Sequence, residues 1–107
     1  MECQVSTKGD IVLITVSGEV DLFYSPKLRE IILEHLNEKH HVGLELSGVS
    51  YIDSSGIASL VEGFQFSKSN GLEFALIATS NSVMQVLRLA RLDKVIPLYN
   101  SLEEFKV

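Results

Sequence analysis

The sequence lacks the residues and segments on which several classes of protein depend. Cys3 is the only cysteine among 107 residues, and one thiol can form neither an internal disulfide nor a cysteine-based metal site. The N-terminus has no positive segment followed by an apolar one, so we expect no signal peptide. No apolar run approaches the ~18–20 residues needed to span a bilayer. These absences predict a cytoplasmic protein without direct membrane insertion.

Positive charge is also scarce. The chain carries 9 Lys and Arg residues against 14 Asp and Glu residues, which gives a formal net charge of −5, and its basic residues are scattered. An acidic chain without a basic run is poorly suited to nucleic acid, so we expect no direct contact with nucleic acid. The hydrophobic fraction of 46% is enough to build a core, and the length suits a single domain spanning residues 1–107.

Alternating and β-branched apolar residues predict five strands. Gly9-Asp10 is a turn signal between the first two strands, which indicates a hairpin. We expect the last strand, at Val95-Ile96, to be a short edge strand that Pro97 ends. The predicted strands cover residues 4–8, 11–17, 42–46, 74–78 and 95–96.

Apolar residues spaced three and four apart predict the helices between these strands. We expect Ser25 to cap the first helix, with Pro26 in its first turn, and that helix to end near residues 39–41. The second helix follows residues 53–56 and stops at Gly71, and Asn81 or Ser82 caps the third. Residues 101–105 form a last helical turn. The order predicts an α/β fold with a mixed, mostly parallel sheet of about five strands packed against about four helices.

The most informative segment covers residues 49–58. In it Ser54 and Ser55 follow Asp53, where an apolar strand and a short loop give way to a helical pattern. A helix start offers free backbone N–H groups and the positive end of the helix dipole, which suit a capping side chain or a phosphate. The segment is therefore either a helix cap only or a cap that also carries a phosphorylation site.

The sequence contains no recognisable set of catalytic residues. A serine nucleophile needs a nearby base, but His35, His40 and His41 are the only histidines and all lie near the end of the first predicted helix. The Gly-x-Ser-x-Gly elbow, a third metal ligand of useful spacing and a phosphate-cradling glycine loop are absent. We therefore predict no enzyme, no catalytic residue, no metal and no cofactor.

Three large side chains precede the first helix. Leu22, Phe23 and Tyr24 stand where a loop is expected. In the core they would be ordinary packing residues. On the surface they would form a patch for a partner, because aromatic side chains dominate the hot spots of interfaces.

Two motifs resemble the STAS domain, a family named for sulfate transporters and anti-sigma factor antagonists. They are Gly18-Glu19-Val20-Asp21 and the segment from Tyr51 to Ile57, and similar residues follow in the right order over almost the whole chain. In bacterial anti-sigma factor antagonists the serine directly after the aspartate accepts the phosphate, and that serine corresponds to Ser54. The sequence departs from the family pattern in having Ala58 where a second glycine is common, Leu22-Phe23-Tyr24 after the first motif, and Ser25-Pro26 at the helix start.

The resemblance implies a regulator that switches partners. The unphosphorylated form would bind an anti-sigma factor with serine kinase activity and release the sigma factor, phosphorylation of Ser54 by that kinase would abolish binding, and a metal-dependent serine phosphatase would restore it. The alternative is a STAS module that docks on a membrane transporter or binds a nucleotide or a lipid, and a serine hydrolase is a third possibility. The residues expected to contact the partner are Asp21, Leu22, Phe23, Tyr24, Asp53, Ser55 and Gly56.

Overall fold

The chain begins with a hairpin. The computed structural model describes all of residues 1–107, and in it strand β1 (Glu2–Lys8) pairs antiparallel with β2 (Ile11–Val20). Gly9, in the two-residue turn between them, has a φ of 61°, a conformation that glycine adopts without strain. The hairpin predicted at Gly9-Asp10 is confirmed.

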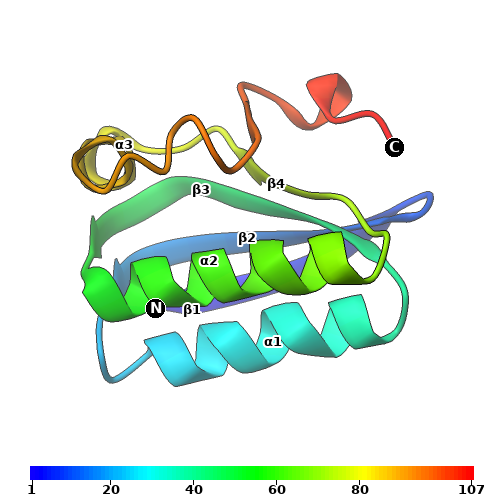
Figure 1. Ribbon diagram of the computed structural model, residues 1–107. Coiled ribbons are helices and arrows are strands. Elements are labelled where there is room, and N and C mark those ends of the chain that lie inside the picture. The colour runs from blue at the N-terminus through cyan, green and yellow to red at the C-terminus, as the bar shows by residue number, and fades with distance from the viewer.

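The remaining strands extend the hairpin into a mostly parallel sheet. Its order is β1-β2-β3-β4-β5, and every pair after the hairpin is parallel. Three α-helices and a 3-10 turn connect or follow these strands, close to the predicted architecture (Figure 1). The elements after the hairpin are α1 (Ser25–Asn37), β3 (His41–Ile52), α2 (Ser54–Ser69), β4 (Phe74–Ile77), α3 (Asn81–Leu89), β5 (Leu98–Tyr99) and the 3-10 helix η1 (Leu102–Glu104).

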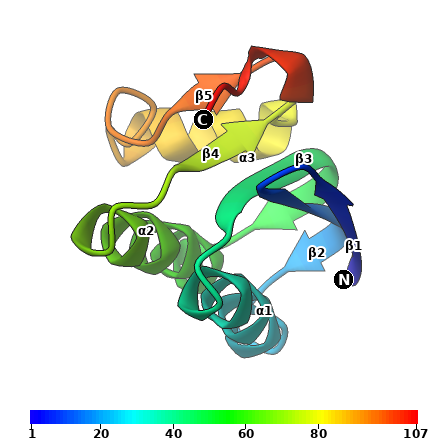
Figure 2. The same cartoon turned by 90° about the vertical axis from the view of Figure 1, so that its right-hand side faces the viewer.

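Helices α1 and α2 lie side by side and cover one face of the sheet. Helix α3 packs against β3 and runs in a different direction from α1 and α2: Figure 1 shows α3 end-on and the other two lengthways, and Figure 2 shows the reverse. All three helices contribute to one core of 19 buried residues. Among its fully buried side chains are Ile14, Leu28, Leu44, Leu60 and Leu87. No helix combines the length and apolar character needed to cross a membrane.

A smaller apolar cluster covers part of the other face. Ile11 on β2 and both Ala75 and Ile77 on β4 meet Phe105, which follows the 3-10 turn. The Phe105 ring stacks on Tyr99 with 5.7 Å between ring centroids. The C-terminal segment therefore packs on the sheet.

Strand β3 is longer than its sequence pattern predicts. It continues through Ile52, so the expected short loop before Asp53 is strand instead. The pairing with β2 shifts register twice, between Thr15 and Ser17 and between Gly18 and Glu19. Each shift inserts an extra residue into β3, which breaks the two-residue alternation of buried side chains.

The structure also corrects both ends of the first helix. Tyr24 occupies the N-cap position, and Ser25 is already helical and buried. The helix ends at Asn37 because Lys39 takes a left-handed conformation with a φ of 70°. His41 therefore belongs to β3 rather than to the helix end. Gly71, with a φ of 68°, does follow the end of α2 as predicted.

Two further predictions in the C-terminal half are wrong. Ser80, not Asn81 or Ser82, caps α3, because its hydroxyl accepts the backbone N–H of Val83. The edge strand lies after Pro97, at Leu98–Tyr99. The predicted strand residues Val95 and Ile96 instead donate their N–H groups to the Leu92 carbonyl, which forms a turn.

The contact between α1 and α2 depends on Gly63, which yields a first testable prediction. A β-carbon on Gly63 would lie 2.7 Å from Cγ2 of Ile32 and 3.1 Å from Cε2 of Phe74. We expect Gly63→Ala to lower the free energy of unfolding by about 1–3 kcal/mol in urea titrations, because this core has no room for a methyl group. Gln65→Ala, at an exposed position of the same helix, should change it by less than about 0.5 kcal/mol. A Gly63→Ala protein as stable as the wild type would contradict this packing.

Candidate functional site

The two aspartate loops lie next to each other at the carboxyl ends of β2 and β3. Val20 and Ile52 are partners in the sheet, and Asp21 and Asp53 directly follow them. The Asp53 N–H donates to the Val20 carbonyl oxygen at 3.2 Å. Helices α1 and α2 both begin at this edge, on the left of Figure 1. Ligands of parallel sheets commonly bind at such carboxyl ends.

Asp53 caps α2 with its side chain. Its Oδ1 accepts the backbone N–H of Ser55 at 3.0 Å, that of Gly56 at 3.1 Å, and the Ser55 hydroxyl at 2.5 Å. These bonds, led by the one from the Ser55 side chain, hold the pKa of Asp53 below its ordinary value. The backbone N–H of Leu22, in the loop after Asp21, makes a smaller contribution that also lowers this pKa.

The two serines of the motif are placed differently. Ser55 is half-buried, and its hydroxyl is occupied by Asp53. Ser54 is the first residue of α2, it is exposed, and its hydroxyl makes no hydrogen bond within the chain. Ser54 is therefore the serine whose hydroxyl is open to another protein.

Gly56 lies beneath this surface. It is buried, and a β-carbon there would be 2.6 Å from Cγ1 of Ile52 and 3.0 Å from Cγ1 of Val20. A glycine is needed because the first turn of α2 rests directly on the last residues of β2 and β3. Gly56 is therefore buried in the free chain and allows this close packing, while its predicted contact with a partner stays a prediction.

The loop before α1 presents the large apolar side chains outward. Leu22 is 75% exposed and Phe23 is 80% exposed, while Tyr24 is half-buried and contacts Phe23 edge-to-face at 4.8 Å between ring centroids. The Asp21 carboxylate accepts the N–H groups of Phe23 at 3.0 Å and Tyr24 at 3.2 Å. Asp21 thus holds the loop in the shape that exposes Leu22 and Phe23, which we call the apolar patch.

Several polar contacts that support the site were not predicted. The buried Ser59 hydroxyl donates to the Ser25 carbonyl oxygen at 3.2 Å and links the second turn of α2 to the start of α1. Arg29 Nε donates to Glu62 Oε2 at 2.7 Å across the same two helices. These partners are far apart in the sequence, so no local spacing reveals them.

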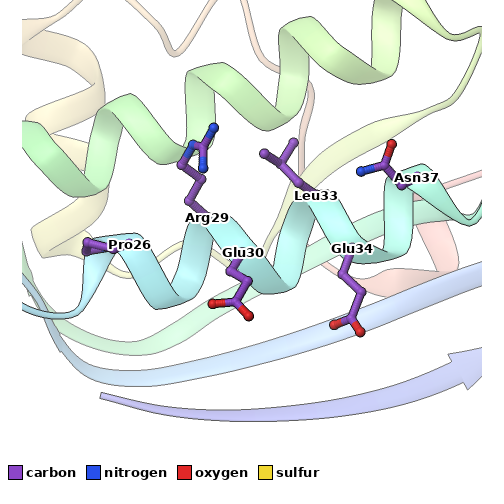
Figure 3. A pocket seen from close by; sticks show the side chains of 6 residues that line it. All are labelled: Pro26, Arg29, Glu30, Leu33, Glu34 and Asn37. Atoms are coloured by element: carbon purple, nitrogen blue, oxygen red, sulfur yellow. The ribbon is translucent and has the colours of Figure 1, made fainter.

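Two open grooves border these helices. One follows α1, has a volume of about 460 Å³ and is lined by Leu33, Pro26 and four polar residues. Among these, Arg29 points toward α2, and Glu30 and Glu34 point away from it (Figure 3). The other, of about 250 Å³, lies between the starts of α1 and α2 and includes Ser55 in its lining. Ala58 is the one hydrophobic residue that lines this second groove.

The cap geometry predicts a specific dependence of stability on pH. Because the pKa of Asp53 is lowered in the folded chain, its contribution to stability is present above the ordinary value of 3.8 and is lost as the pH falls through the folded pKa. We expect Asp53→Asn to reduce the acid-side slope of the free energy of unfolding, measured in urea between about pH 5 and pH 3. Asp10→Asn, at the exposed β1–β2 turn, is the matched control. Equal slopes for Asp53→Asn and the wild type would contradict the proposed cap.

Comparison with known proteins identifies the family of the chain. Residues 2–105 match the STAS domain. The anti-sigma-B factor antagonist of Listeria monocytogenes is 27% identical over 92 residues, which cover 85% of this chain and 81% of that relative. The anti-sigma F factor antagonist of Paenibacillus polymyxa is 26% identical over an alignment of 113 positions, gaps included, which covers all of this chain and 97% of that relative. Among solved structures, an anti-sigma factor antagonist from Mycobacterium paratuberculosis has a TM-score of 0.83 at 24% identity, covering 96% of this chain and 88% of that one. The chain belongs to the STAS domain family.

Proposed function

We propose that the protein is an anti-sigma factor antagonist that acts by switching partners in the cytoplasm. In its unphosphorylated form it binds an anti-sigma factor with serine kinase activity, so that the sigma factor is released. The observation that carries this proposal is the exposed, unoccupied Ser54 hydroxyl on the same edge as the apolar patch. The names of relatives such as the Listeria monocytogenes protein support it.

The apolar patch is the surface we assign to the partner. Leu22 and Phe23 are exposed beside Asp53, and exposed aromatic side chains supply much of the binding energy of interfaces. Asp21 and Asp53 give the surrounding surface a negative character. The partner should therefore present an apolar pocket with basic residues at its rim.

A phosphate on Ser54 would oppose this binding. Phosphorylation adds about −1.5 to −2 charges at pH 7, next to the ionised Asp53 carboxylate. The cap already occupies the N–H groups of Ser55 and Gly56, so they are not free to neutralise the phosphate. Burying an unpaired phosphate in an interface costs on the order of 2–5 kcal/mol, roughly a 30-fold to several-thousand-fold loss of affinity.

The partner kinase, not this chain, would catalyse the phosphoryl transfer. The Ser54 oxygen attacks the γ-phosphate of ATP held by the kinase, ADP leaves, and the hydroxyl proton passes to a base of the kinase. No histidine of this chain lies beside Ser54 to act as that base. His40 and His41 lie at the amino end of β3, whereas Ser54 follows its carboxyl end. A metal-dependent serine phosphatase would hydrolyse the phosphoserine and restore binding.

The state of Ser54 should set the affinity for the kinase. We expect Ser54→Asp to weaken binding to the anti-sigma factor at least ~30-fold and Ser54→Ala to bind like the unphosphorylated protein even with ATP present. Ser69→Asp, which places the same charge at the exposed far end of α2, should bind normally. Isothermal titration calorimetry measures all three. Equal affinity of Ser54→Asp and Ser54→Ala would refute the switch, and co-purification with a transporter subunit instead would favour the alternative STAS role.

The apolar patch should contribute directly to that affinity. We expect Phe23→Ala to cost about 1–3 kcal/mol of binding, or roughly a tenfold to hundredfold loss, without changing the thermal stability of the free protein. Leu89→Ala removes another highly exposed apolar side chain, 86% exposed at the end of α3, and should leave the affinity unchanged. If both variants bind like the wild type, the partner does not use this patch.

A further inference from the structure

Strand β1 forms a free edge of the sheet. It pairs only with β2, and Figure 2 shows it at the side of the sheet opposite β5. An edge strand presents unpaired backbone groups that can accept another strand. This edge has seven residues in regular extended structure, and Val5 at its centre is 48% exposed.

The hairpin determines which backbone groups of β1 face outward. Lys8 and Ile11 flank a two-residue turn and therefore form a hydrogen-bonded pair. Bonded and non-bonded pairs alternate along an antiparallel ladder. Counting back from Lys8, the N–H and C=O groups of Cys3, Val5 and Thr7 point away from β2.

The sequence of β1 is complementary to itself in the antiparallel direction. When two copies are opposed about Val5, Cys3 of each copy faces Thr7 of the other, so the outward backbone groups meet one another. The same register places Glu2 of each copy opposite Lys8 of the other, which forms two pairs of opposite charge. Registers centred on Cys3 or Thr7 lose these charge pairs and shorten the ladder.

We propose that β1 pairs with β1 of a second copy of this chain about a two-fold axis at Val5. The two five-stranded sheets then form one continuous sheet. A two-fold dimer of this kind is closed, because each free edge is covered by the other. The carboxyl ends of β2 in the two copies point in opposite directions, so both Ser54 surfaces stay accessible.

A charge exchange tests the register. Sedimentation velocity from about 10 µM to about 1 mM, at low salt, measures dimerisation in the range expected for a small interface. We expect Lys8→Glu to weaken the dimer about tenfold or more, because the new carboxylate at position 8 then faces Glu2 of the other copy. The double variant Glu2→Lys with Lys8→Glu should restore dimerisation. A wild type that stays monomeric throughout, or a dimer unaffected by Lys8→Glu, would overturn the proposal.

A disulfide tests the symmetry axis independently. With Cys3→Ser removing the only native thiol, Val5→Cys places two thiols directly opposite each other, at a β-carbon separation of about 4.5–5.5 Å. We expect rapid formation of a covalent dimer under mild oxidation. Lys8→Cys in the same background should not form a covalent dimer. Position 8 of one copy lies six residues along the paired strand from position 8 of the other, which separates the two thiols by roughly 20 Å. Equal cross-linking of both variants would contradict an axis at Val5.

Discussion

The packing of the first turn of α2 onto the ends of β2 and β3 is the constraint on which the site depends. Gly56 has no side chain, so the helix rests directly on Val20 and Ile52. The same close approach places the Asp53 carboxylate where it can accept the N–H groups of the next turn. If this contact were looser, the cap and the adjacent loop before α1 would lose their common support. The position of the exposed serine is therefore set by core packing rather than by the surface around it.

This arrangement gives two neighbouring serines different tasks. The Ser55 hydroxyl belongs to the cap and helps to keep Asp53 ionised, while Ser54 projects from the helix start without a partner. A modification of Ser54 can then change the surface without disturbing the fold. The loop that exposes Leu22 and Phe23 is held in turn by the Asp21 carboxylate. In the proposed function, the fold presents a hydroxyl that a kinase can phosphorylate next to the apolar patch.

Much of this could be predicted from local sequence, and the failures have physical causes. The strand and helix order follows from apolar periodicity, and Asp53 before two serines is a recognisable helix start. The end of β3 was missed because two bulges space its buried residues three apart, at Leu46, Val49 and Ile52, which conceals the alternation of a strand. The edge strand was misplaced because Ile96 is apolar to fill the core, not to pair in the sheet. The exposure of Phe23 could not be decided from the sequence, because an apolar loop residue can face either way.

The central claim is that Ser54 carries the regulatory phosphate. Intact-mass spectrometry of the protein purified from its native host, with fragmentation to locate any added group, tests it most directly. The account predicts a species heavier by about 80 Da whose phosphate lies on Ser54 and disappears after phosphatase treatment. A phosphate on Ser55 or elsewhere, or an unmodified mass under all growth conditions and after incubation with ATP and the cognate kinase, would contradict it.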